Sequence, residues 1–269
     1  MKELVIKHFD HGASQYSRHA VIQKEIALKL LNDTVNCVSN TQKNTDSGSN
    51  FLFKRCLDLG CGPGVNYSEL KQYAEYVVGA DLSPVMVEEA LKLNIPGTES
   101  FVADMEQLQS GPEITGYTYD FIFSSLAMQW CNITTVLNQI TGIKKYREYQ
   151  TVALSLPLCD TLPELRSALK NIGAGDRTYQ FTDFEHVCTA AKKILGSNIN
   201  VSKHTFTDKH SNIKSYLEAI RSIGANTTSQ HHSLSKSQYR DLMLYLQGQL
   251  TEHGYLSHTY PVVFIYGTI

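Results

Sequence analysis

Composition and charge exclude several classes of protein. The chain has 269 residues, of which 42% are hydrophobic and 19% charged, and its formal net charge at pH 7 is −2. These fractions are typical of a soluble globular protein built as one large domain. A net charge so close to zero gives no bulk attraction to nucleic acid or to a membrane surface, and we expect neither as a partner. No stretch approaches the roughly 20 apolar residues of a membrane span, and no signal peptide is evident.

The cysteines and histidines are scattered along the chain. Neither a C-x-x-C pair nor an H-E-x-x-H run occurs, so we expect no metal site. A disulfide framework would be unusual in a chain of this length, and the six cysteines therefore favour a reducing, cytoplasmic location. His231 and His232 adjoin in a polar stretch, and we interpret them as loop residues.

The N-terminal part is predicted to be helical. Residues 2–31 carry apolar side chains at helical spacing, and Gly12 separates two helices. Tyr16 follows in the turn between them, where it is either a core tyrosine with a surface hydroxyl or a residue of the site. Residues 32–50 are rich in Asn, Thr, Ser and Asp, and we predict a flexible connection there.

A strand followed by a glycine-rich turn is the central feature of the sequence. Apolar residues up to Leu59 predict a buried strand, and Gly60, Gly62 and Gly64 follow it, before a helix-compatible run over 67–73. This order presents backbone N–H groups to a ligand, and glycines let the backbone approach it closely. Taken alone, the glycines also fit an ordinary tight turn between a strand and a helix.

Two aspartates follow the next two predicted strands. Asp81 ends the apolar run 76–80, and Asp104 ends the run 101–103. An acid after the second strand of such a unit is placed to accept hydrogen bonds from ribose hydroxyls. Either aspartate alone could be a helix N-cap. The glycine spacing is G-x-G-x-G with Asp58 two residues ahead, which differs from the dinucleotide pattern G-x-G-x-x-G.

This pattern resembles the class I S-adenosylmethionine-dependent methyltransferases. The resemblance implies a Rossmann-like α/β fold with a seven-stranded, mostly parallel sheet, an antiparallel edge strand, helices on both faces and a helical lid. It also implies S-adenosyl-L-methionine as cofactor. Gly60, Gly62 and Gly64 would pass beneath the methionine part, and Asp58 would lie near its ammonium group.

The same resemblance implies contacts with the adenosine part. Asp81 would hold the ribose hydroxyls, and Leu82 would lie against the adenine. Asp104 would accept from the adenine amino group, and the Met105 backbone N–H would face the ring. Ser124, at the end of the fourth predicted strand, is counted among the cofactor-binding residues.

The remaining elements alternate, which predicts a parallel sheet with right-handed crossovers. We expect one domain over 1–269, with a cofactor-binding core at 51–156, a helical lid at 157–196 and a C-terminal part at 197–269. The predicted strands are 53–59, 76–80, 100–103, 119–124, 151–156, 198–206 and 255–269, the last as the antiparallel edge. The predicted helices are 65–73, 84–93, 162–172, 183–195, 213–223 and 236–250. Residues 143–150 stand where most methyltransferases of this class have a Pro-Gly-Gly turn.

Peripheral stretches narrow the resemblance. Residues 9–23, 125–131, 162–165 and 216–226 resemble the malonyl-acyl-carrier-protein O-methyltransferases of biotin synthesis, the BioC family. That resemblance implies methylation of the free carboxylate of a malonyl thioester, carried by acyl carrier protein or by coenzyme A, in an early step of biotin synthesis. It is compatible with a monomer. A carboxylate is ionised at neutral pH, so the reaction needs no general base.

Three residues are the candidates for catalysis. Arg221 would hold the malonyl carboxylate, because a guanidinium matches its geometry. Tyr16 and Trp130 would close the pocket and exclude water. Each has a structural alternative: Arg221 could pair with Glu218 at the surface, and Trp130 could be a core aromatic. Arg177 is the next candidate for the carboxylate.

A local basic patch would attract an acidic carrier protein. The candidates are Lys192, Lys193, Lys209 and Lys214, each of which could equally be a solvated surface lysine.

Three other functions remain open. The first is methylation of another small carboxylate or of a quinone or phenol. The second is a nucleotide-binding Rossmann protein, against which Asp104 and the glycine spacing argue. The third is a methyltransferase-like partner protein without activity.

Overall fold

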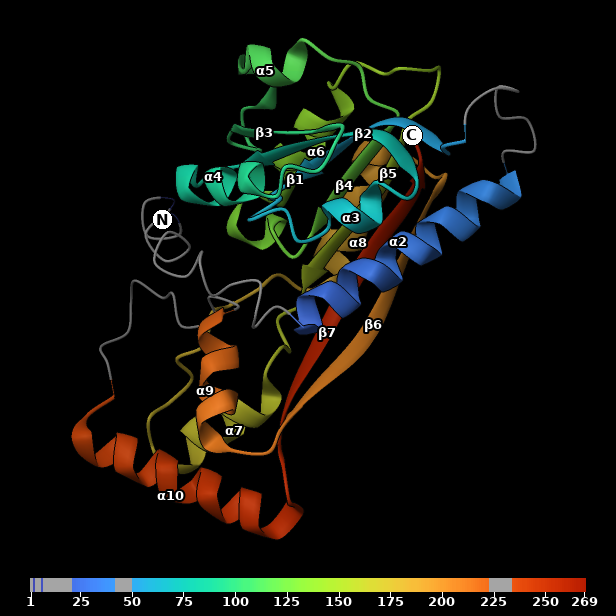
Figure 1. Cartoon of the computed structure of the whole chain (residues 1–269). Coiled ribbons are helices and arrows are strands. Elements are labelled where there is room, and N and C mark those ends of the chain that lie inside the picture. Colours follow the sequence, from blue (N-terminus) through green and yellow to red (C-terminus); the bar gives the residue numbers. More distant parts are fainter. Residues whose placement is uncertain (1, 3–5, 7–20, 42–49, 223–233) are drawn as a thin grey trace.

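A seven-stranded sheet forms the centre of the computed structural model, which describes residues 2, 6, 21–41, 50–222 and 234–269 (Figure 1). The strand order is β3-β2-β1-β4-β5-β7-β6, and β7 runs antiparallel to both of its neighbours. The strands are β1 (Phe53–Leu59), β2 (Ala74–Asp81), β3 (Thr98–Val102), β4 (Phe121–Ser125), β5 (Thr151–Pro157), β6 (Ile199–His210) and β7 (Leu256–Thr268). All seven predicted strands are confirmed.

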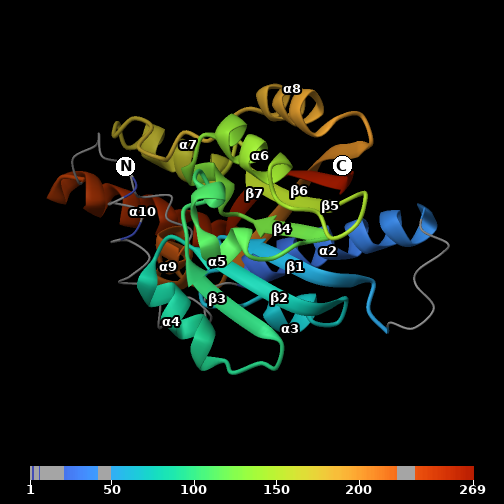
Figure 2. The ribbon, with the colours of Figure 1, turned by 90° about the horizontal axis from the view of Figure 1, so that it is seen from above.

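Helices cover both faces of the sheet, giving three layers (Figure 2). One face carries α2 (Val21–Thr41), α3 (Tyr67–Leu70) and α4 (Pro84–Lys92), and the other carries α5 (Pro112–Thr115), α6 (Ile133–Thr141) and α8 (Phe184–Leu195). Successive residues of β4 serve opposite layers, because side chains alternate along a strand: Phe121 and Phe123 pack on one side and Ile122 on the other. Near-continuous apolar strands are expected of a sheet covered on both faces.

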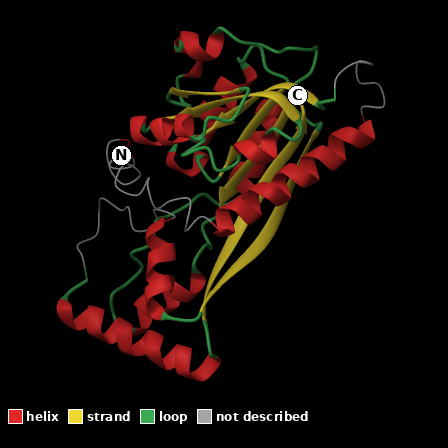
Figure 3. Cartoon of the chain, in the orientation of Figure 1, coloured by secondary structure: helices red, strands yellow, loops and turns green. Residues whose placement is uncertain are grey.

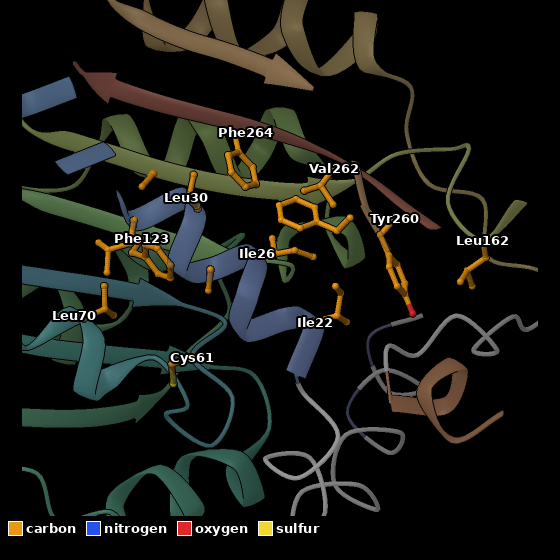
Figure 4. Close-up of a cluster of buried hydrophobic side chains, with 14 of the residues drawn as sticks. Ile22, Ile26, Leu30, Cys61, Leu70, Phe123, Leu162, Tyr260, Val262 and Phe264 are labelled. Carbon is orange, nitrogen blue, oxygen red and sulfur yellow. The ribbon is translucent and has the colours of Figure 1, made fainter. Parts of the chain in front are cut away.

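Helix α2 is held to the sheet by an apolar stripe. Ile22, Ile26 and Leu30 recur every four residues and face Phe123 and Phe264 of the strands (Figure 4). The helix continues to Thr41, so the predicted flexible connection starting at residue 32 is wrong for residues 32–41. Asparagine and threonine hide this helix from composition alone. Its inward positions are nevertheless buried, and the Thr34 hydroxyl donates to the Leu30 carbonyl at 2.7 Å.

The long strands β6 and β7 extend from the sheet to a second group of helices (Figure 3). This helical lobe consists of α7 (Pro163–Asn171), α9 (Ile213–Ser222) and α10 (Lys236–His253). The antiparallel orientation of β7 is confirmed, but its predicted edge position is wrong, since β7 lies between β5 and the edge strand β6. Among the helices that the structure describes, none combines the length and the apolar character that crossing a bilayer demands.

The two helices predicted as a lid lie in different places. Helix α7 packs in the lobe, against β7 and α10, whereas α8 packs against α6 and the sheet. Helix α6 was not predicted, and the helix predicted over 65–73 spans only Tyr67–Leu70. The chain between α7 and α8, rather than the two helices, reaches the site described next.

Candidate active site

A pocket lies at the carboxyl ends of β1, β2, β3 and β4, where open α/β sheets bind ligands. Its lining includes seven residues that the sequence analysis selected: Gly60, Gly62, Asp81, Leu82, Asp104, Met105 and Trp130. These residues are distant in sequence and come together because parallel strands end at one edge of the sheet. The six further lining residues are Met86, Ala103, Ser125, Leu126, Ala127 and Cys131.

The glycine turn is closely packed at Gly60 and open at Gly62. Gly60 has φ +71°, and a Cβ there would stand 2.2 Å from the Ala127 Cβ. Gly62 has φ +54°, and a Cβ placed there would point into open space, with no neighbouring atom within 4 Å. The conformation of both glycines is one that other residues rarely adopt. The turn is therefore a cradle where a ligand can approach the backbone.

Asp81 is fixed at the end of β2 by two backbone donors. Its Oδ2 accepts from the Gly62 N–H at 2.9 Å, and its Oδ1 accepts from the Ser83 N–H at 2.9 Å. Each carboxylate oxygen has capacity for a second hydrogen bond. Asp81 thus connects the glycine turn to the start of α4 and presents a preset pair of acceptors to the pocket.

Asp104 belongs to a short chain of polar contacts at the pocket rim. Its Oδ1 accepts from the Glu106 N–H at 2.9 Å, and its Oδ2 accepts from the Lys2 ammonium at 2.6 Å. Lys2 also pairs with Glu106, whose Oε1 accepts from the Asn132 N–H at 2.8 Å. These contacts join Lys2 and the stretch after β3 to the start of α6, so one side of the pocket is held together by charge.

Asp58 is a buried carboxylate beneath the glycine turn. Its side chain is 1% exposed, and neither oxygen has a hydrogen-bond partner among the described residues. Burial, followed by the nearby charge of Asp81, raises the pKa of Asp58 to about 8. An ionised carboxylate is costly in such a place without a compensating cation. A cation bound close to Asp58 would supply that compensation, although Asp58 itself is not among the residues that line the pocket.

Like Asp58, the selected residues Gly64 and Ser124 lie outside the pocket lining. Gly64 packs near Leu93 and Tyr67, and a Cβ there would stand 2.8 Å from the Leu93 Cδ1. Ser124 is fully buried, and its hydroxyl donates to the Leu59 carbonyl at 2.8 Å. Gly64 therefore serves the turn, Ser124 joins β4 to β1, and the neighbouring Ser125 reaches the pocket instead.

The three catalytic candidates are placed to different extents. Trp130 lines the pocket. Tyr16 lies outside the described residues, and Arg221 lies near the end of α9 with a side chain outside them. The alternative candidate Arg177 lies between α7 and α8, and its Nε donates to the Ala174 carbonyl at 2.9 Å.

Leu126 shows why part of the pocket was missed. It follows β4 with φ +52°, a conformation unusual for leucine, and its N–H donates to the Ser155 carbonyl at 3.1 Å. This bend brings Ala127 against Gly60. No composition signal marks such a bend, although the run from Leu126 to Trp130 was singled out by resemblance.

Comparisons with known proteins agree with this geometry. Residues 57–145 match the family of methyltransferase domains. The fold is similar to that of the YcgJ protein from Bacillus subtilis, with a TM-score of 0.53 and 12% identity over 88% of this chain and 98% of that one. It is also similar to magnesium protoporphyrin IX methyltransferase from Synechocystis, solved with bound S-adenosylhomocysteine, with a TM-score of 0.50 and 18% identity over 97% and 98% of the two chains.

The match over residues 57–145, together with the glycine cradle and the acids at successive strand ends, indicates a methyltransferase domain that uses S-adenosylmethionine. Over nearly its full length, the chain is similar to enzymes named malonyl-[acyl-carrier protein] O-methyltransferase. The enzyme from Bacillus anthracis is 24% identical over 99% of this chain and 97% of its own. That from Laribacter hongkongensis is 26% identical over 98% and 88% of the two chains.

Proposed function

We propose that this enzyme methylates the free carboxylate of a malonyl thioester on acyl carrier protein, an early step of biotin synthesis. The observation that carries the proposal is the extent of the similarity to malonyl-acyl-carrier-protein O-methyltransferases. It covers 99% of the chain for the Bacillus anthracis enzyme, whereas the methyltransferase domain itself matches only residues 57–145. The similarity therefore includes the helical lobe, where substrate-specific parts are expected.

The pocket residues fit the cofactor as follows. We infer that Asp81, whose two oxygens are held at the pocket by backbone N–H groups, accepts from both ribose hydroxyls. Asp58 supplies the negative charge for the ammonium group, which its burial without a described partner supports. Leu82 lies against the adenine, the Met105 backbone N–H faces the ring, and Asp104 accepts from the adenine amino group.

The chemistry asks little of the protein beyond positioning. Bound S-adenosylmethionine supplies the methyl group and a good leaving group. A malonyl carboxylate is already ionised near pH 7, so the protein's part is to orient one carboxylate oxygen and to exclude water. We assign the orientation to Arg221 and the exclusion of water to Tyr16 and Trp130. Arg177 remains the alternative for the carboxylate.

Partner and location follow from the same proposal. We infer that the malonyl group is carried by an acidic acyl carrier protein, with malonyl-coenzyme A as the alternative substrate. We also infer that the enzyme is a monomer. The scatter of six cysteines along a chain of this length supports a reducing cytoplasmic location.

Mass spectrometry of malonyl-acyl carrier protein tests the proposal. After incubation with enzyme and S-adenosylmethionine, the malonyl carrier should gain the mass of one methylene group, and the acetyl carrier should gain nothing. Malonyl-coenzyme A in a parallel reaction establishes which carrier is preferred. Methylation of neither malonyl substrate, by a protein that binds S-adenosylhomocysteine, would refute the assignment and point to another acceptor.

A further inference from the structure

The wall of the pocket at Trp130 continues into a cluster of aromatic rings. Trp130 meets Tyr179 edge to face at 4.8 Å between ring centroids, and Phe181 lies 6.4 Å away. Tyr179 and Phe181 are themselves 4.9 Å apart, and the Tyr179 hydroxyl donates to the Gln129 carbonyl at 3.3 Å. The pocket-lining face of Trp130 is thus backed by two rings from the connection between α7 and α8.

That connection has no regular secondary structure, yet Arg166 of α7 binds it at several points. The Arg166 Nε donates to the Thr161 carbonyl at 3.1 Å, and its Nη2 donates to the Tyr179 carbonyl at 3.3 Å. Its Nη1 pairs with Asp176. The planar guanidinium therefore reaches the chain before α7 and two places in the chain after it.

Asp176 extends this arrangement within the connection. Its Oδ1 accepts from the Thr178 N–H at 2.9 Å and from the Thr178 hydroxyl at 2.7 Å. Its Oδ2 accepts from the Gln180 amide at 3.1 Å. Hydrogen bonds, together with the Arg166 charge, hold the pKa of Asp176 below its usual value although burial opposes this. The turn that precedes Tyr179 and Phe181 is consequently built around one ion pair.

A single exposed ion pair contributes little to stability. The Arg166 and Asp176 side chains keep 20% and 40% of their exposure. The importance of Arg166 lies in its geometry, because a fork of fixed donors ties the chain before α7 to two points of the connection. Lysine at this position would keep the charge and lose the fork.

We propose that Arg166 is a positioning residue that acts through Tyr179 and Phe181 to keep Trp130 in place as a water-excluding wall of the cofactor pocket. The proposal deepens the proposed function, and it rests on that function only where it concerns the methyl acceptor. The role of Arg166 in the pocket wall does not depend on which acceptor the enzyme methylates.

The single tryptophan of the chain provides a direct measurement. In Arg166→Met, which keeps most of the apolar stem, acrylamide quenching of Trp130 fluorescence should roughly double as the backing rings loosen. Affinity for S-adenosylhomocysteine should fall about threefold to tenfold. Arg166→Lys should restore little of either. Tyr179→Phe, which removes only the hydroxyl, should change both quantities less than Arg166→Met does.

Lys29→Met is the matched control. Lys29 pairs with Asp33 at 3.0 Å on the surface of α2, a helix that contributes no residue to the pocket lining or to the connection, so its loss should leave quenching and affinity at wild-type values. If Arg166→Met fails to fold, Asp176→Asn tests the same turn with a smaller change. Wild-type quenching and wild-type affinity in a folded Arg166 or Asp176 variant would overturn the proposal.

The two proposals fail in different ways. Quenching and S-adenosylhomocysteine binding involve no acceptor, so a changed Trp130 signal without any methylation of malonyl carrier would reject the acceptor alone. Normal methylation by wild type, together with an Arg166→Met enzyme of unchanged kcat, KM and quenching, would reject the role of Arg166 alone.

Discussion

Asp81 already accepts two backbone N–H groups, so both of its oxygens are held in place at the pocket before a ligand binds. We expect Asp81→Ala to reduce affinity for S-adenosylhomocysteine at least tenfold, because charge-assisted hydrogen bonds contribute roughly 1.5–3 kcal/mol each. Calorimetric titration measures this. Asp33→Ala, which removes a surface partner of Lys29 on α2, is the control and should bind normally. Unchanged affinity in Asp81→Ala would remove the ribose assignment.

Asp58 should lower the stability of the ligand-free protein and strengthen the binding of the cofactor. Its pKa is raised to about 8 in the folded protein, so ionisation opposes folding progressively as pH rises from about 4 to 8. Ligand-free Asp58→Asn lacks this penalty and should be more stable than wild type at pH 7. The difference should grow by about 2 kcal/mol between pH 6 and pH 8.

Urea denaturation of both proteins at the two pH values measures that difference. The same variant should bind S-adenosylhomocysteine more weakly, since an amide gives no countercharge for an ammonium group. A variant less stable than wild type at both pH values would contradict the assignment of Asp58 as a desolvated carboxylate.

The role of Arg221 is tested by measuring turnover of the acceptor and affinity for the cofactor separately. We expect Arg221→Ala to lower turnover on malonyl carrier at least tenfold, because a charged hydrogen-bond donor to the carboxylate is lost. Its affinity for S-adenosylhomocysteine should stay at the wild-type value. A folded variant with native turnover would make Arg221 structural, and Arg177→Ala would then be the experiment to perform.

The sequence reveals those site residues whose position follows from topology. Asp81 and Asp104 stand after apolar runs, so their meeting at one sheet edge is predictable. Ser124 shows the limit of such predictions. Side chains alternate along β4, so the Ser124 hydroxyl bonds to the neighbouring strand β1 whereas Ser125 lines the pocket. Asp58 was selected only by resemblance, and its burial without a described partner was not predicted. Lys2 gave no signal at all, since its contact with Asp104 joins residues 102 positions apart.

At the scale of elements, β6 separates the lysines considered for carrier docking. Lys192 and Lys193 are in the last turn of α8, before β6 begins, whereas Lys209 and Lys214 lie at and after its end. Because β6 runs parallel to β1–β4, its end lies toward the same side of the sheet as the pocket. The four lysines therefore do not form one patch, and we favour Lys209 and Lys214.

Charge reversal tests that preference. Lys209→Glu with Lys214→Glu should slow association with an acidic carrier protein severalfold at low salt and reduce its salt dependence. Lys192→Glu with Lys193→Glu is the matched control, with the same change of charge at the other end of β6. Stopped-flow association rates compare them. Equal slowing by both pairs would indicate bulk charge rather than a docking site.

Strand and helix predictions differ in accuracy for a physical reason. Apolar runs such as β4 and β5 are buried on both faces and stand out in any context. The second half of α2 carries polar residues between a few buried ones, so only tertiary packing distinguishes it from a loop. Helix α6, in contrast, has an Asn132 N-cap and apolar residues at helical spacing, a signal that the sequence contains and that the prediction overlooked. Strand order is similarly hidden, since nothing local to β7 says that it enters the sheet between β5 and β6.

On the scale of the whole molecule, the helical lobe and the sheet meet at a buried histidine. His258 of β7 stacks on Tyr216 of α9 at 3.8 Å, and its Nε2 lies 2.9 Å from the Tyr216 carbonyl. Burial, with a further effect of His210, lowers the pKa of His258 to about 4. The neutral ring is therefore favoured in the fold, and its contribution to stability is complete above about pH 6.5.

Acidification should reduce the contribution of the His258–Tyr216 contact to the stability of the fold. Between pH 6.5 and 4 the unfolded state binds a proton that folded His258 does not, which lowers stability by up to about 3 kcal/mol. We expect the stability of His258→Phe at pH 4, measured by urea denaturation relative to its stability at pH 6.5, to exceed that of wild type, because the variant loses the His258 contribution while the opposite slope of Asp58 is present in both proteins. His186→Gln, a change at an exposed histidine, should leave the wild-type slope. The same slope in His258→Phe would assign the acid sensitivity to another group.

The place of β7 also affects the order in which the chain can fold. While the protein emerges from the ribosome, β1 to β5 can pair with strands already made, but β6 has no neighbour until residues 256–268 follow it. For that interval the nascent chain exposes two unpaired strand edges, those of β5 and β6, and such edges invite association with other chains. Stalling of synthesis between α10 and β7 should therefore give a species that binds chaperones, whereas stalling after β7 should not.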